Sequence, residues 1–224
     1  MHILYEDNHL LAVLKPAGLA TMGLAPGRPT LLELARQYIK RRYKKPGNVY
    51  LGVVSRLDVP VSGVVLFART SKAARRLTEQ FRTRAVEKSY WAIVEGRIEP
   101  PSGEFIDWMA RDDRSHGARI LSRPAPGAKE ARLRYRRLKT LGDCSLVEID
   151  LETGRKHQIR LQLAHRGHPV LGDRKYGSRR EFPAGIALHA RRLVVTHPVQ
   201  GQPVELIAPV PPAWRQFGVS GQPG

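Results

Sequence analysis

The chain has 224 residues, enough for one large domain or two small ones, and 42% of them are hydrophobic, so it can bury a core. Thirty-eight Lys and Arg residues against twenty Asp and Glu residues leave a formal net charge of +18. This charge favours a polyanionic partner, most commonly nucleic acid. The alternatives are an organism whose proteins are generally basic, or an anionic membrane as the partner. A single cysteine, Cys144, excludes an intrachain disulfide and a multi-cysteine metal site, and suits a reducing cytosol.

No segment has the pattern of a membrane span or a secretory signal. The longest apolar runs are short pieces such as residues 10–14, and the opening residues include Glu6 and Asp7 instead of a basic and then apolar stretch. The histidines at 157, 165, 168, 189 and 197 show no familiar zinc spacing. We therefore expect a cytoplasmic protein that binds no membrane and no metal.

The first third of the chain predicts a strand, a turn and a helix. Residues 10–14 are typical of a short buried strand, and the turn Lys15-Pro16-Ala17-Gly18 follows. Thr30 and Glu33 are spaced as a capping box before a helix predicted over 31–43. The basic run 40–45 at its end has two compatible interpretations: solvated cations favoured by the helix dipole, or a surface that contacts phosphates.

The remaining elements alternate between strands and one more helix. A core strand is predicted over 64–68, and Ser71 is the expected cap of a helix with Ala74, Leu77 and Phe81 on its apolar face. Further strands are predicted over 90–94, 131–138, 145–151, 192–196 and 204–208, a long surface loop over 111–128, and a flexible tail over 216–224. This order predicts an α+β fold with a mixed, mostly antiparallel sheet and flanking helices, in one domain over 1–215.

Two segments carry the residues with chemical potential. The first is Ser55–Gly63, where Asp58 stands just before a buried strand and Pro60 and Gly63 restrict the loop. An aspartate at such an edge can face a cleft, but taken alone it is more often a turn residue or a cap.

The second segment runs from Leu151 to Pro169 and turns at Gly154 into a short helix that Gly167 can end. Four basic groups crowd the start of this helix, where cations oppose the helix dipole: Arg155, Lys156, His157 and Arg160. A bound phosphate or a facing carboxylate would offset that cost, whereas exposed side chains that extend into solvent are the structural alternative. The clustering favours function.

Together these segments resemble the RluA-type family of pseudouridine synthases. The family stretch His-Arg-Leu-Asp-x-x-Thr-Ser-Gly stands here as residues 55–63, Thr-Gly-Arg-x-His-Gln-Ile-Arg as 153–160, and Gly-His-Pro-x-x-Gly-Asp-x-x-Tyr-Gly as 167–177. The opening segment, the Lys-x-Tyr strand at 88–90 and the closing block at 188–198 also match, so the resemblance covers roughly residues 5 to 212 in order. An ordered set of this kind is far more specific than one short motif.

The resemblance implies a pseudouridine synthase fold with a central RNA-binding cleft, formed by a catalytic domain without the N-terminal S4-type domain of many members. By position, Asp58 matches the catalytic aspartate, Tyr90 the active-site tyrosine, Arg160 the arginine that pairs with the aspartate, and Arg56 a basic residue near the extruded base. The expected RNA-binding set is Arg56, Arg155, His157 and Gln158. Ser55 and Val61 replace the usual histidine and threonine, and Gln162 stands where a histidine is common, which leaves local hydrogen bonding and substrate choice open.

The reaction that the resemblance implies breaks the N1–C1′ bond of a uridine, rotates the uracil and rejoins it through C5. It needs no nucleotide cofactor, flavin or metal, and we expect no cofactor. The target base must be flipped out of its stack, which is easiest in a stem-loop of tRNA or rRNA. We expect a monomer that acts on such an RNA.

Two other functions fit part of the sequence. A non-catalytic RNA-binding protein could keep the same scaffold, although it would gain nothing from a buried aspartate near phosphates. A glycosidase-like or nucleosidase-like hydrolase would need a second carboxylate, and no other acidic residue in the two segments has a claim like that of Asp58.

Overall fold

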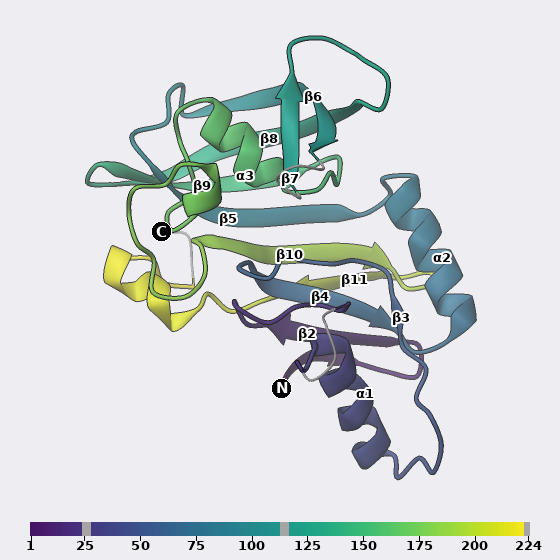
Figure 1. Ribbon diagram of the computed structural model, residues 1–224. Helices are drawn as coiled ribbons and strands as arrows, with labels where there is room; N and C mark the ends of the chain where they lie inside the picture. The colour runs from purple at the N-terminus through teal and green to yellow at the C-terminus, as the bar shows by residue number, and fades with distance from the viewer. Residues whose placement is uncertain (24–27, 113–116, 222–224) are drawn as a thin grey trace. The chain divides into compact units, whose positions relative to one another are not determined.

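The computed structural model describes residues 1–23, 28–112 and 117–221, which form two compact units (Figure 1). Unit 1 comprises Met1–Glu87 and Ala190–Pro209, and unit 2 comprises Lys88–His189 and Val210–Gly224. The single catalytic domain over 1–215 stays a prediction, because compactness alone does not show which parts fold independently. No helix among the described residues is long and apolar enough to cross a membrane.

Unit 1 contains strands with one helix on each face, and its pairs β1-β2, β2-β4, β3-β4 and β10-β11 are antiparallel. It contains β1 (His2–Glu6), β2 (Leu10–Lys15), β3 (Gly52–Val53), β4 (Ser62–Ala68), most of β10 (Leu188–Thr196) and β11 (Pro203–Ile207), with the helices α1 (Leu31–Arg42) and α2 (Ser71–Arg82). The strand order is β1-β2-β4-β10, with β3 on β4 and β11 on β10. Along β2 and β4 the residues pair in an unbroken antiparallel register.

The two central strands of unit 1 are buried on both faces because each face carries a helix. Leu10 and Leu66 belong to the core with the apolar side of α2, whereas Leu11 and Phe67 belong to the core with α1. Successive side chains of a strand point to opposite faces, so both faces need apolar residues. This explains why 10–14 and 64–68 are continuous apolar runs, and both predicted strands are confirmed.

The helix starts of unit 1 confirm one predicted cap and correct the other. The capping box is present: the Glu33 N–H donates to Thr30 Oγ1 at 3.3 Å, and the Thr30 N–H donates to Glu33 Oε2 at 2.8 Å. The cap of α2 is Thr70, whose Oγ1 accepts from the Ala73 N–H at 3.1 Å, and not Ser71. Thr70 is the residue with extended backbone, so its hydroxyl reaches the free N–H groups and Ser71 lies one position too far into the helix.

Unit 2 contains five strands of the same 11-stranded sheet, paired antiparallel in the order β5-β9-β8-β6-β7. Its elements are β5 (Glu87–Glu95), β6 (Ser102–Asp112), β7 (Gly117–Leu121), β8 (Lys129–Leu141), β9 (Cys144–Leu151), α3 (Gln158–His165) and the 3-10 helices η1 (Arg174–Tyr176) and η2 (Pro212–Phe217). The predicted strands over 90–94, 131–138 and 145–151 lie within β5, β8 and β9. The α+β fold with a mostly antiparallel sheet is confirmed.

Two sequence-based expectations in unit 2 were wrong. Of the loop predicted over 111–128, residues 117–121 form β7, which pairs with β6 and buries Ala118; residues 113–116 lie outside the described part of the chain. The tail predicted from residue 216 is structured at its start, because Phe217 stacks on Phe182 with ring centroids 5.6 Å apart and Val219 is buried. Residues 222–224 lie outside the described chain.

Candidate active site

The loop that carries Asp58 is tied to unit 1 on both sides of the aspartate. Before it, the hydroxyl of Thr21 accepts from the Leu57 N–H at 3.2 Å and donates to the Leu57 carbonyl at 3.1 Å. After it, the carbonyl of Val59 accepts from the Gly18 N–H at 2.8 Å. A turn closes over the aspartate, since the Val61 N–H donates to the Asp58 carbonyl at 3.1 Å. The half-buried Asp58 side chain is therefore presented by a fixed backbone.

A buried lysine holds this loop through hydrogen bonds to backbone carbonyls. Lys15 ends β2, is fully buried, and donates from Nζ to the carbonyls of Pro16 (3.0 Å), Leu19 (2.6 Å) and Val59 (3.1 Å). Three carbonyl acceptors match the three N–H donors of the charged ammonium. Burial lowers the pKa of Lys15 to about 8, and the nearby negative charge of Asp58 acts in the opposite direction. The ammonium thus persists at neutral pH and lies close enough to Asp58 to attract its carboxylate.

Gly63 fixes where the loop enters strand β4. Its φ is +128°, a conformation that L side chains rarely adopt, and a Cβ at this position would lie 2.3 Å from the Ala190 carbonyl oxygen and 2.5 Å from the Ala190 nitrogen. No side chain fits against the backbone of β10 at this distance. The sequence pattern Ser-Gly after the aspartate therefore has a steric cause.

In unit 2, the segment 153–160 forms the turn between β9 and α3, and much of it is used to hold that turn. The buried amide of Gln158 accepts from Thr153 Oγ1 (2.8 Å) and from the Arg155 N–H (3.0 Å), and donates to the Arg132 carbonyl on β8 (3.1 Å). Arg155 in turn donates from Nε to the Glu130 carbonyl at 2.9 Å. The motif thus fastens α3 to the neighbouring strand.

Arg160 pairs with a carboxylate inside unit 2. Its Nε and Nη2 donate to Oδ2 and Oδ1 of Asp173 at 2.6 and 2.9 Å, and the two side chains are 6% and 1% exposed. A facing carboxylate was one of the two expected ways to offset cations at the start of α3, and Asp173 supplies it. Asp58 belongs to unit 1, and the predicted interaction of Arg160 with Asp58 stays a prediction.

Tyr176 connects Arg160 with His157. Its hydroxyl lies 2.7 Å from His157 Nδ1, and the guanidinium of Arg160 stands over its ring at 5.1 Å from the centroid. His157 has a φ of +56°, which is unusual for a residue other than glycine. A histidine held in this conformation by a hydrogen bond to a fixed tyrosine is typical of a positioned functional group.

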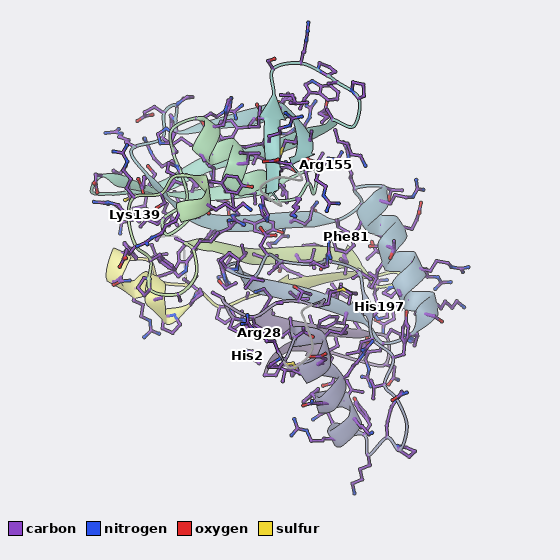
Figure 2. All side chains as sticks on the ribbon, in the orientation of Figure 1. His2, Arg28, Phe81, Lys139, Arg155 and His197 are labelled. Carbon is purple, nitrogen blue, oxygen red and sulfur yellow. The ribbon has the colours of Figure 1, made fainter. Side chains whose placement is uncertain are left out.

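The predicted site residues are divided between the two units. Asp58 and the exposed Arg56 belong to unit 1, whereas Tyr90, Arg160 and the other predicted RNA-binding residues belong to unit 2. The structure brings His157 and Arg160 together through Tyr176, and Arg155 and Gln158 through the hydrogen bond from the Arg155 N–H to the Gln158 side-chain oxygen. Arg155 is labelled on unit 2 in Figure 2. Tyr90 is half-buried on β5, opposite Ile149 of β9.

Sequence reasoning assigned no role to three residues that hold this machinery: Lys15, Asp173 and Tyr176. All three stand inside segments that matched the family pattern, so the positions were visible although the contacts were not. Within the described part of the chain, no group of three or more His, Cys, Asp or Glu side chains is placed to hold a metal ion.

Comparison with known proteins gives a consistent result over most of the chain. A family model described as RNA pseudouridylate synthase matches residues 9–165. The chain is 36% identical over 215 residues to an uncharacterized RNA pseudouridine synthase, YhcT, of Bacillus subtilis, covering 94% of this chain and 69% of the relative. It is 34% identical over 240 residues to tRNA pseudouridine synthase C of Pasteurella multocida, covering 96% and 93%.

A third relative and a solved structure extend the comparison. Ribosomal large subunit pseudouridine synthase D of Xylella fastidiosa is 36% identical over 225 residues. The matched region covers 94% of this chain but only 66% of that relative. Human RNA Pseudouridylate Synthase Domain Containing 1 superimposes with a TM-score of 0.75 at 28% identity, covering 94% of this chain and 83% of the human one. With its Thr153–Arg160 turn, its Asp58 loop and this match in sequence and fold, the chain belongs to the RluA-type family of RNA pseudouridine synthases, which are isomerases.

Proposed function

We propose that this protein isomerises specific uridines of RNA to pseudouridine and that Asp58 is its essential catalytic residue. The observation that carries the proposal is the construction of the Asp58 loop. Thr21 and Gly18 hold the backbone on either side of the aspartate, and the buried ammonium of Lys15 lies near its carboxylate. The buried Lys15 ammonium and its three hydrogen bonds to carbonyls hold this loop in place, so the aspartate is already oriented before substrate binds.

The chemistry of the reaction asks for such a carboxylate. Cleavage of the N1–C1′ bond leaves an electron-poor sugar, and the bond electrons depart with the uracil. An ionised Asp58 then either forms a covalent bond to C1′ or removes the C2′ proton to give a glycal. In both routes the uracil rotates and C5 bonds to C1′; the covalent route breaks the Asp58–C1′ bond at this step, and the glycal route returns a proton to C2′. C5 then loses its proton and N1 gains one, so the product has the same composition as the substrate.

The roles proposed for unit 2 concern the base and the charge of the aspartate. Arg160 would hold the Asp58 carboxylate, and the pair with Asp173 supports this by fixing the guanidinium. Tyr90 would stack on the base and assist removal of the C5 proton. Both roles follow from the positions of these residues in the family pattern.

The four predicted RNA-binding residues differ in how much of each side chain remains for RNA. Arg56 is exposed, and the ring of His157 already engages Tyr176 through Nδ1. Arg155 uses Nε within unit 2, and the amide of Gln158 is buried and engaged. We propose Arg56 and His157 as direct contacts, with Gln158 acting by holding the turn that presents its neighbours.

The substrate we propose is a stem-loop of tRNA or rRNA. Relatives covering most of this chain are named for tRNA and for ribosomal large-subunit pseudouridine synthesis. A loop nucleotide is already partly unstacked, which reduces the few kcal/mol needed to flip it. The net charge of +18 supplies the attraction to the phosphates on either side.

The test compares two Asp→Asn variants on transcribed tRNA and rRNA fragments labelled with tritium at uridine C5. Asp58→Asn should lower tritium release at least about a thousandfold while RNA binding is retained. Asp143→Asn is the control, because that side chain is 72% exposed and lies on unit 2, and its activity should stay within about twofold. Undiminished release by Asp58→Asn would remove the catalytic assignment, and free uracil among the products would indicate a hydrolase.

A further inference from the structure

Helix α1 ends in a cluster of exposed cations that the proposed chemistry does not use. Between residues 31 and 50 the chain carries six Lys and Arg residues and one acidic residue, Glu33. The Glu33 side chain is hydrogen-bonded in the capping box at the other end of the helix. We call the exposed group Lys40, Arg41, Lys44 and Lys45 the α1 basic end. Figure 2 shows side chains extending outward from the last turns of α1 and the connection that follows.

The charges of the α1 basic end are not neutralised within the protein. Among the described residues, none provides a carboxylate within ion-pair distance of these four side chains. Their neighbour Arg42 differs, because it lies 3.4 Å from Glu6. Several exposed arginines of unit 2 also have acidic partners, for example Arg134 with Glu152 at 3.2 Å. The α1 basic end therefore presents a positive field that no acidic side chain among the described residues neutralises, which favours contact with a polyanion.

The backbone at the end of α1 argues that stability alone does not explain these lysines. The Lys44 N–H donates to the Arg41 carbonyl at 3.3 Å and the Lys45 N–H to the Lys40 carbonyl at 3.0 Å, which are the two hydrogen bonds of a Schellman motif. Its left-handed position, normally glycine, is held by Lys44 with a φ of +48°. A lysine in this conformation is less favourable than glycine, so the positive side chain at position 44 lowers the stability of the folded state.

The position of the α1 basic end fits a contact at a distance from the reacting uridine. The start of α1 is joined to the segment next to the catalytic loop, because the Leu31 N–H donates to the Ala20 carbonyl at 2.9 Å and Thr21 bonds Leu57. A helix of twelve residues is about 18 Å long. The cations at its far end lie about that far from its start, so they would meet other nucleotides than the flipped one.

We infer that the α1 basic end is a second RNA-contact surface, which binds the phosphate backbone of the substrate RNA outside the catalytic loop. This inference rests on the proposed function for the identity of the polyanion. The surface offers point charges and no planar pocket for a base, so it contributes affinity and salt dependence without sequence preference. Neutralising it should raise KM and leave kcat unchanged, because it makes no contact with the reacting nucleotide.

The experiment measures binding of a fluorescent RNA stem-loop with a uridine-rich loop as a function of salt concentration. The variant Lys40→Gln/Arg41→Gln/Lys44→Gln/Lys45→Gln should bind about tenfold or more weakly, and its slope of log K against log salt should be less negative by up to about 3. The control removes the same charge from arginines that already have acidic partners: Arg97, Arg134, Arg136 and Arg174. If attraction came from net charge alone, both fourfold variants would weaken binding equally, and the inference would be overturned.

A single substitution gives a second readout of opposite sign. Lys44→Gly should raise Tm by about 2–4 °C, because glycine suits the left-handed position, and should also weaken RNA binding and lower the salt slope by about 0.7–0.9. A gain in Tm with unchanged RNA binding would show that this helix end is merely structural, and would refute the inference. The inference would also be refuted if the variants lost binding to anionic phospholipid vesicles but still bound RNA as the wild type does. Because these measurements need no turnover, they stay informative if Asp58→Asn disproves the proposed catalysis.

Discussion

Replacing Asp173 with asparagine should strongly destabilise unit 2, because it leaves the guanidinium of Arg160 charged, buried and without its carboxylate. The pair is bidentate, at 2.6 and 2.9 Å, and its side chains are 6% and 1% exposed. Removing one partner of a buried pair costs about 3–5 kcal/mol. The amide of an asparagine keeps one acceptor but turns an NH2 group toward a guanidinium N–H, so the expected cost lies within this range.

The matched control is an equally short pair in water. Arg174 and Glu181 lie 2.5 Å apart, but their side chains are 75% and 83% exposed. Because exposed pairs contribute little, Glu181→Gln should change the free energy of unfolding by less than about 1 kcal/mol. Urea unfolding at neutral pH measures both variants, and their m-values should match that of the wild type if the denatured state is unchanged.

A double-mutant cycle distinguishes loss of the pair from loss of volume. In the background of Arg160→Met, Asp173→Asn should cost clearly less than in the wild type, because no buried cation is left unpaired. If Asp173→Asn costs no more than Glu181→Gln, or costs the same in both backgrounds, the buried pair does not hold the turn and the reasoning is refuted. Catalysis should fall together with stability, since the proposed orientation of Arg160 depends on the same pair.

Three further predictions concern unit 1. Gly63→Ala should cost more than about 3 kcal/mol in urea unfolding, because its Cβ would meet the Ala190 backbone at 2.3 Å; a mild effect would show that β10 can move. Because the pKa of Lys15 in the folded state is lowered to about 8, the folded state gains stability as the pH rises from 8 to 10.5. Over this range the free energy of unfolding of the wild type should rise by up to about 3 kcal/mol relative to Lys15→Met. Equal pH profiles of the free energy of unfolding would contradict a buried ammonium. Burial raises the pKa of Asp7, but hydrogen bonds from the N–H groups of residues 9 and 10 and from His197 hold this pKa below its usual 3.8. The stabilisation from Asp7 should therefore be complete above pH 3.8 and lost as the pH falls below that value. Asp7→Asn should therefore differ from the wild type at pH 6 and converge with it in acid, as followed by thermal unfolding.

Local patterns predicted most of the strands of both units, for reasons the structure makes plain. Residues 10–14 and 64–68 were predicted as strands because helices cover both faces of the sheet and require apolar residues at every position. The capping box of α1 was visible because both of its members lie three residues apart. Strand β7 was missed because an edge strand with polar neighbours has no such requirement, and η2 because its apolar partner Phe182 is distant in sequence.

The candidate site divides along the same line between local and distant information. Asp58 and the turn 153–160 were found from short patterns. The supports of these segments were not, since Lys15 reaches Val59 across 44 positions and Arg160 meets Asp173 across 13. Burial converts an ordinary lysine into a loop anchor, and sequence spacing does not report burial. Residues that hold a site are thus harder to predict than residues that carry its chemistry.

The family pattern does not by itself separate RNA contacts from scaffold, but hydrogen-bond accounting does. The buried amide of Gln158 already satisfies both of its ends with Thr153, Arg155 and Arg132, so binding a base would break contacts that cost about 1–3 kcal/mol each to leave unmade. Arg56 is exposed and faces no such cost. Although both stand in the motifs, Arg56 is the stronger candidate for direct contact with RNA, and substitutions at Gln158 should act on stability before they act on binding.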